Sequence, residues 1–133
     1  MKQLFLSILF VAILLLLLLL LSGCQSKELL FTGEGDQWLG TITVSQTGGD
    51  EIYTIQLNYR GDDLKAIDTF GYRVESSHNG ALEYSANEIL LNEKGIYKGK
   101  MLSSNSPSTT SEDELMLEVS WNDKSEKLVL KNK

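Results

Sequence analysis

The hydrophobic and polar positions divide the chain into two unlike parts. From Leu4 to Leu21 every residue except Ser7 is apolar, and the run ends in eight consecutive leucines. From Gln37 onward, apolar residues instead alternate with polar ones. The first pattern is typical of an export signal or a membrane-spanning helix. The second is typical of β-strands with one buried face.

The alternation is clearest from residue 53 to residue 59, where two tyrosines and two aliphatic residues occupy every second position. The same pattern predicts strands near 38–45, 70–75, 82–84, 89–91, 96–102, 115–121 and 128–130. Glycine-, asparagine- and aspartate-rich turns separate them at 47–50, 61–63, 78–80, 92–95 and 122–124. Only Asp62 to Asp68 suits a helical turn within this part.

About seven or eight short strands with a turn every 8–12 residues favour a sandwich or a barrel. Alternation rather than continuous apolar runs favours antiparallel pairing. We therefore predict an all-β fold, an antiparallel two-sheet immunoglobulin-like sandwich, with a small β-barrel as the alternative. The likeness is architectural only, because the Cys-Trp-Cys pattern of antibody domains is absent.

Three segments are expected from these patterns. Residues 1–23 are predicted to be a signal peptide, 24–36 a tether, and 37–133 a single β-sandwich domain. Within the tether, Leu29 to Phe31 suit either a short first strand or a staple onto the domain. Gly33 to Asp36 would be a flexible entry to the domain.

The sequence Leu21-Ser22-Gly23-Cys24 resembles the lipobox of bacterial lipoproteins, in a setting that begins with the basic Lys2. The resemblance implies a diacylglyceryl group, with acyl chains such as palmitate, on the Cys24 thiol, followed by cleavage between Gly23 and Cys24. The protein would then be lipid-anchored at the extracytoplasmic face of the cell membrane. An uncleaved transmembrane helix is the alternative, and it would export and tether the domain as well.

Charge and cysteine content narrow the remaining possibilities. The chain holds 12 Lys and Arg, one of them Lys2, against 18 Asp and Glu, so the part after residue 23 has a formal charge of −7. This acidity disfavours binding to nucleic acid. Cys24 is the single cysteine, so neither a disulfide nor a cysteine-based metal site is expected, and no cofactor is predicted.

Two segments resemble small uncharacterised lipoproteins of Gram-positive, spore-forming bacteria. One is the Gly-Glu-x-x-x-Trp opening at 33–38, and the other is the closing hairpin at 119–130. The resemblance implies a single β domain. It carries no functional residues over to this chain.

No catalytic residue is predicted. His78 follows Ser76 and Ser77, but it sits in a turn, and a catalytic triad needs a third, orienting group. Acidic clusters occur at 50–51, 62–63 and 112–114. None has the spacing of a calcium loop, so we interpret them as solvated loop charge and expect no metal site.

The remaining candidates concern binding. The aromatic residues are expected in the core, with Tyr97 less firmly placed than the others: Trp38, Tyr53, Tyr59, Tyr72 and Trp121. The loop from Ser103 to Asp113 is either functional or disordered. The polar face of Thr54, Gln56 and Asn58 has few charges, which suits a partner. We therefore expect a non-enzymatic binding module for an envelope protein or small ligand, with a small envelope hydrolase or a passive structural component as alternatives.

Overall fold

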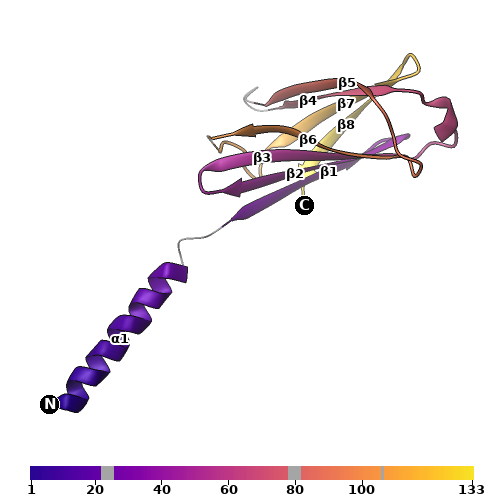
Figure 1. Cartoon of the computed structure of the whole chain (residues 1–133). Helices are drawn as coiled ribbons and strands as arrows, with labels where there is room; N and C mark the ends of the chain where they lie inside the picture. The colour runs from indigo at the N-terminus through magenta and orange to yellow at the C-terminus, as the bar shows by residue number, and fades with distance from the viewer. Residues whose placement is uncertain (22–25, 78–81, 106) are drawn as a thin grey trace.

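The computed structural model describes residues 1–21, 26–77, 82–105 and 107–133 (Figure 1). One helix, α1 (Lys2–Leu21), precedes eight strands. The strands are β1 (Lys27–Glu34), β2 (Trp38–Thr47), β3 (Asp50–Tyr59), β4 (Phe70–Ser76), β5 (Glu83–Ile89), β6 (Ile96–Ser104), β7 (Glu114–Trp121) and β8 (Lys124–Asn132). A short 3-10 turn, η1 (Leu64–Ala66), lies between β3 and β4, where the sequence suggested a helical turn.

All eight strands form one antiparallel sheet in the order β5-β4-β7-β8-β1-β2-β3-β6, which curls into a nearly closed barrel. The all-β, antiparallel prediction is confirmed, but the two-sheet immunoglobulin-like sandwich is wrong. The reason is β1, which pairs with β2 along its whole length and also with β8 at Phe31↔Asn132 and Thr32↔Lys131. These contacts join two groups of four strands into a single sheet.

The first strand also moves the expected domain boundary. Residues 27–34, which the sequence predicts to be part of a tether, form β1, with Leu29 and Phe31 buried in the core. Gly33 lies so close to β8 that an added Cβ would stand 2.4 Å from the Val129 carbonyl oxygen. The sheet therefore extends to the N-terminal side of Gln37, and Leu29 to Phe31 form part of its first strand.

The barrel interior is filled by buried side chains from seven strands and by Leu82, just before β5, with partly buried residues of β5 packed against them. Its core consists of Leu29, Phe31, Trp38, Ile42, Val44, Tyr53, Ile55, Leu57, Phe70, Tyr72, Val74, Leu82, Met101, Leu115, Leu117, Val119, Trp121, Leu128 and Leu130. Trp38 is fully buried and packs its ring against Tyr59, Phe70 and Trp121 at centroid distances of 5.3, 5.1 and 5.5 Å. The prediction that the aromatic residues form the core is confirmed, with Tyr59 partly buried at its margin.

Two-residue turns set the register of two hairpins. Gly48 and Gly49 have φ of +59° and +87°, and Asn122 and Asp123 have φ of +47° and +60°. Two successive positive φ values match the right-handed twist of a hairpin, and glycine, asparagine and aspartate adopt them most readily. Both turns lie where the sequence predicts them. The turn predicted at His78 to Gly80 lies outside the described residues.

The barrel has two ends. The tether end holds the start of β1, the β2–β3 turn and the β6–β7 loop, and the far end holds the β1–β2, β5–β6 and β7–β8 turns (Figure 1). Helix α1 extends away from the barrel, its described side chains exposed (Figure 1). It is long and apolar enough over Lys2–Leu20 to cross a membrane. Its position and composition are consistent with a signal sequence, and so suggest secretion or membrane targeting.

Candidate functional site

Among the described residues, the sheet is left unclosed between β5 and β6. These strands are the two ends of the strand order, and each is paired on one side only. We call this interruption the seam. An unpaired strand edge presents backbone N–H and C=O groups to the surroundings, which makes it a template for another strand. The seam is therefore the part of the wall with unused hydrogen-bonding capacity.

The register shows which backbone groups of β6 face the seam. Alternate residues of an antiparallel strand exchange both hydrogen bonds with one neighbour, and the residues between them point away. The Tyr59 N–H donates to the Gly95 carbonyl at 2.8 Å, which fixes the phase of the β3–β6 ladder. Two and four residues further along β6, Tyr97 and Gly99 also bond to β3. The backbone of Lys98 and Lys100 therefore faces the seam.

The same argument applies to β5. The Ser76 N–H donates to the Leu82 carbonyl at 3.0 Å, and Tyr84 stands two residues further along the same ladder, opposite Val74. The backbone groups of Glu83 and Ser85, which lie between these positions, face the seam. The β4–β5 ladder is irregular between Phe70 and Tyr72, and Glu88 has φ of +56°. The β3–β6 ladder also shifts register, between Tyr53 and Thr54, so each edge strand is regular over only part of its length.

Three tyrosines line the seam on the inside of the barrel. Tyr72 on β4 lies 6.0 Å from Tyr84 on β5 and 6.2 Å from Tyr97 on β6, measured between ring centroids. The Tyr72 hydroxyl is buried without a hydrogen-bond partner among the described residues. Burial raises the pKa of this hydroxyl, so it stays protonated. Tyr97, which the sequence left less firmly placed, is half-buried and packs on Phe70 at 5.9 Å.

Outside the barrel, β6 borders an uncharged polar surface. A shallow hollow is lined by Thr41, Thr43, Thr54, Ile55, Gln56, Lys98 and Gly99. Thr54 and Gln56 belong to the polar face that the sequence singled out, and Gln56 Nε2 donates to Asn58 Oδ1 at 3.0 Å. Lys98 and Lys100 are exposed at its margin, and neither has an ion-pair partner in the described part of the chain.

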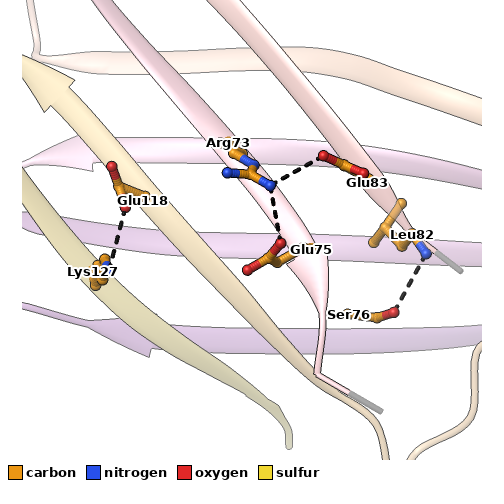
Figure 2. Close-up of polar contacts among 7 residues, drawn as sticks. All are labelled: Arg73, Glu75, Ser76, Leu82, Glu83, Glu118 and Lys127. Carbon is orange, nitrogen blue, oxygen red and sulfur yellow. Dashed lines mark hydrogen bonds and ion pairs between the residues drawn. The ribbon is translucent and has the colours of Figure 1, made fainter. Parts of the chain in front are cut away.

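The opposite wall differs, because its charges are paired. On β4, the Arg73 guanidinium lies 3.3 Å from Glu75 and 3.1 Å from Glu83, and on β7 and β8 Glu118 faces Lys127 at 3.8 Å (Figure 2). Arg73 and Glu118 are themselves cross-strand partners. The outer wall of β4, β7 and β8 thus carries several exposed ion pairs, whereas neither lysine of β6 has an ion-pair partner in the described residues.

A second polar feature lies at the tether end. Glu51 is 1% exposed and points inward, in phase with the buried Tyr53. Its carboxylate accepts hydrogen bonds from the Gln46 amide at 2.6 Å, from the Thr109 N–H and hydroxyl, both at 3.2 Å, and from the Tyr53 hydroxyl. The Gln46 amide also donates to the Thr109 carbonyl at 2.9 Å. We call this group the Glu51 cluster.

Burial by itself would raise the pKa of Glu51. The hydrogen bonds from Tyr53, Gln46 and the backbone of residues 108 and 109 together outweigh burial and hold this pKa below its ordinary value. Burial and the adjacent carboxylate raise the pKa of Tyr53 to about 12, so its hydroxyl remains a donor. The cluster is therefore a charged, satisfied latch that holds the β6–β7 loop on the barrel.

The interpretation of residues 50–51 as solvated loop charge is thus wrong for Glu51, although Asp50 is exposed. The signal that could have placed Glu51 was its phase, because it stands two residues before Tyr53 in the alternating strand. The loop from Ser103 to Asp113 is also more structured than its composition suggests. Ser103 belongs to β6, and the Thr110 N–H donates to Asp113 Oδ2 at 2.9 Å.

The other predicted site residues do not come together in the described structure. Gly23, Cys24 and His78 lie outside the described residues. The Ser77 hydroxyl donates to the Glu114 carbonyl at 2.9 Å. Ser76 Oγ accepts the Leu82 N–H at 3.4 Å, as Figure 2 shows. Within the described residues, no three His, Cys, Asp or Glu side chains are grouped to hold a metal ion.

The two segments that carried the family resemblance meet at the far end of the barrel. The Glu126 carboxylate on β8 accepts the Gln37 N–H at 3.0 Å and the Trp38 N–H at 3.1 Å. Gly35 leaves room for this carboxylate, since an added Cβ would lie 2.0 Å from it. The contact between these two segments is therefore structural, because it attaches the β1–β2 connection to β8.

Comparison with known proteins leaves the chain without an assigned relative. No protein-family model, no curated protein and no solved structure matches it. The resemblance to small lipoproteins of spore-forming bacteria stays a prediction.

Proposed function

We propose that the protein is a non-enzymatic interaction module, held by lipid on Cys24 at the extracytoplasmic face of the cell membrane. The observation that carries the binding role is the seam, where two strand edges of an otherwise continuous wall stay unpaired. The filled interior supports the same role, because an enzyme of this size needs a concave site for its substrate, and aromatic and aliphatic side chains occupy the barrel.

The anchor is supported by the apolar helix and by the four residues that follow its leucine run. Each lipid CH₂ buried in a bilayer adds about 0.8 kcal/mol, so two acyl chains hold a protein far longer than one. With β1 starting at Lys27, only a few residues separate Cys24 from the barrel. The domain would therefore stand close to the membrane with its far end outward.

Anchoring is tested by labelling cells with a clickable palmitate analogue. Full-length protein should take up the label and lose the first 23 residues, whereas Cys24→Ser should do neither. Ser26→Ala, two residues away, is the matched control and should behave as the wild type. An unlabelled wild-type protein that keeps its full mass would show that α1 is a transmembrane anchor and would overturn the lipid proposal.

Binding is tested in intact cells with a photo-reactive amino acid placed at single positions. Position 98 on β6 is expected to capture one recurrent partner, identified by mass spectrometry. Position 127, on the ion-paired wall, is the matched control and should capture none above background. Absence of a partner from positions spread over all strands would contradict the interaction role.

A further inference from the structure

We infer that the β6 edge binds an extended acidic segment of a partner protein by strand addition, with carboxylates of the partner meeting Lys98 and Lys100. This inference rests on the proposed function and names its surface and the chemistry of its partner. Three features of the seam support it: the direction of the free backbone groups, the unpaired lysines and the tyrosine-lined inner side.

The first of the three features is the backbone of β6. Lys98 and Lys100 direct their N–H and C=O groups away from β3, as the ladder phase requires. An added strand would satisfy these groups, and main-chain hydrogen bonds of this kind provide affinity in strand-addition complexes. Both edge ladders shift register once, but Lys98 and Lys100 lie within the stretch Ile96–Lys100 of β6, which pairs with β3 without a shift.

The lysines supply the specificity. Side chains two residues apart in a strand lie on the same face, about 6.6 Å apart. Lys98 and Lys100 therefore form a short positive row beside the uncharged Thr54 and Gln56. A partner strand with acidic residues at every second position would place its carboxylates at the same spacing as the two lysines. Pairing of β6 with β6 of a second copy would instead bring like charges together, which is destabilising.

The inner side of the seam suits the alternate residues of the same partner strand. These residues would face Tyr84 and Tyr97, which are half-buried, and would approach Tyr72. The Tyr72 hydroxyl is buried without a hydrogen-bond partner of normal geometry among the described residues. A short polar side chain such as threonine on the incoming strand would offer it one. The partner segment is thus one in which acidic residues alternate with small or β-branched ones.

The probe is an octapeptide of alternating threonine and glutamate, added to the full chain in detergent micelles. Amide hydrogen exchange should slow at Lys98 and Lys100 but not at Tyr97 and Gly99, whose amides already bond to β3. A peptide of alternating threonine and lysine should have no effect. Binding should weaken as salt is raised, because the lysines are exposed.

Two variants separate charge from backbone. Replacing both lysines with glutamate keeps the free N–H groups and should weaken binding about tenfold or more, since charges of like sign then face each other. Lys98→Pro removes a donor that faces the seam and should abolish the protection, while Lys98→Ala retains it in part. If Lys98→Pro does not fold, the double charge reversal decides the question.

Several outcomes would overturn the inference. Equal binding of Lys98→Pro and the wild type, or equal binding of inorganic polyphosphate and the peptide, would show a simple anion-binding surface. Self-association of a Lys98→Thr, Lys100→Thr variant without peptide protection would show that the lysines only guard the edge. Partner capture in cells from position 127 instead of 98 would leave the interaction role intact and refute the β6 site.

Discussion

At the residue scale, the most informative side chain is the Glu51 carboxylate. Strands that alternate inward and outward normally place apolar residues inside, and a charge is tolerated there only when it is fully hydrogen-bonded. Glu51 meets this condition through Gln46, Tyr53, Thr109 and the backbone of residue 108. Since Thr109 belongs to the β6–β7 loop, one carboxylate holds together two parts of the chain 58 residues apart.

The variant Glu51→Gln tests this latch. The amide has the same shape as the carboxylate, but its NH₂ group would face hydrogen-bond donors and cannot accept from them. We therefore expect the free energy of unfolding to fall by about 1–3 kcal/mol. Urea denaturation at pH 7 measures it. Asp50→Asn, next in the chain but exposed, should change stability by less than about 0.5 kcal/mol. Equal effects of the two variants would contradict the latch.

The latch also predicts a pH dependence. Because the pKa of Glu51 is lower in the folded state than its ordinary value of 4.5, its contribution to stability is present above that value. It is lost as pH falls through the lower folded-state pKa. The wild type should therefore lose more stability than Glu51→Gln between pH 6 and pH 3.

At the element scale, the β1–β2 connection depends on a residue from the other end of the chain. Glu126 accepts the N–H groups of Gln37 and Trp38, and hydrogen bonds to charged groups contribute about 1.5–3 kcal/mol each when buried. Glu126 is only partly buried, so we expect Glu126→Gln to cost about 1–2 kcal/mol. Glu118→Gln, which breaks an exposed ion pair to Lys127, should cost under 1 kcal/mol. Thermal unfolding of both variants distinguishes these values.

Local sequence patterns predict the turns and the strands but not the pairing of distant strands. Positive-φ turns at Gly48–Gly49 and Asn122–Asp123 were predictable, because their residue types suit the backbone they adopt. Alternation placed the strands and most of the aromatic core. Neither pattern contains information about pairing between strands distant in sequence. The contact of Phe31 with Asn132, 101 residues apart, was therefore missed, and with it the barrel and the seam.

The candidate site was predictable only in its parts. The polar character of Thr54 and Gln56 is visible in the sequence, and so are the two lysines at 98 and 100. Their placement side by side depends on the β3–β6 register, which joins strands separated by β4 and β5. Which strands have free edges is decided by the strand order, and two exposed lysines do not identify an edge strand by themselves.

At the scale of the whole molecule, the helix and the barrel are energetically separate, while β1 is integral to the barrel. The described side chains of α1 are exposed, so a chain of residues 26–133 should unfold at the same temperature as the full chain in detergent. A chain of residues 37–133 lacks Leu29 and Phe31, whose burial contributes about 2–3 kcal/mol each, as well as the pairing of β1 to β2 and β8. Against a total stability of about 5–15 kcal/mol, that loss should leave it unfolded.

Circular dichroism and thermal unfolding of the two truncated chains measure this difference. Within residues 26–133, Phe31→Ala should cost about 3–5 kcal/mol, while Leu30→Gln, on the exposed side of the same strand, should cost far less. A folded 37–133 chain would show that β1 is an accessory strand and that the domain begins where alternation begins. An unfolded one would place the domain boundary at Lys27, which leaves only a short segment between Cys24 and the barrel.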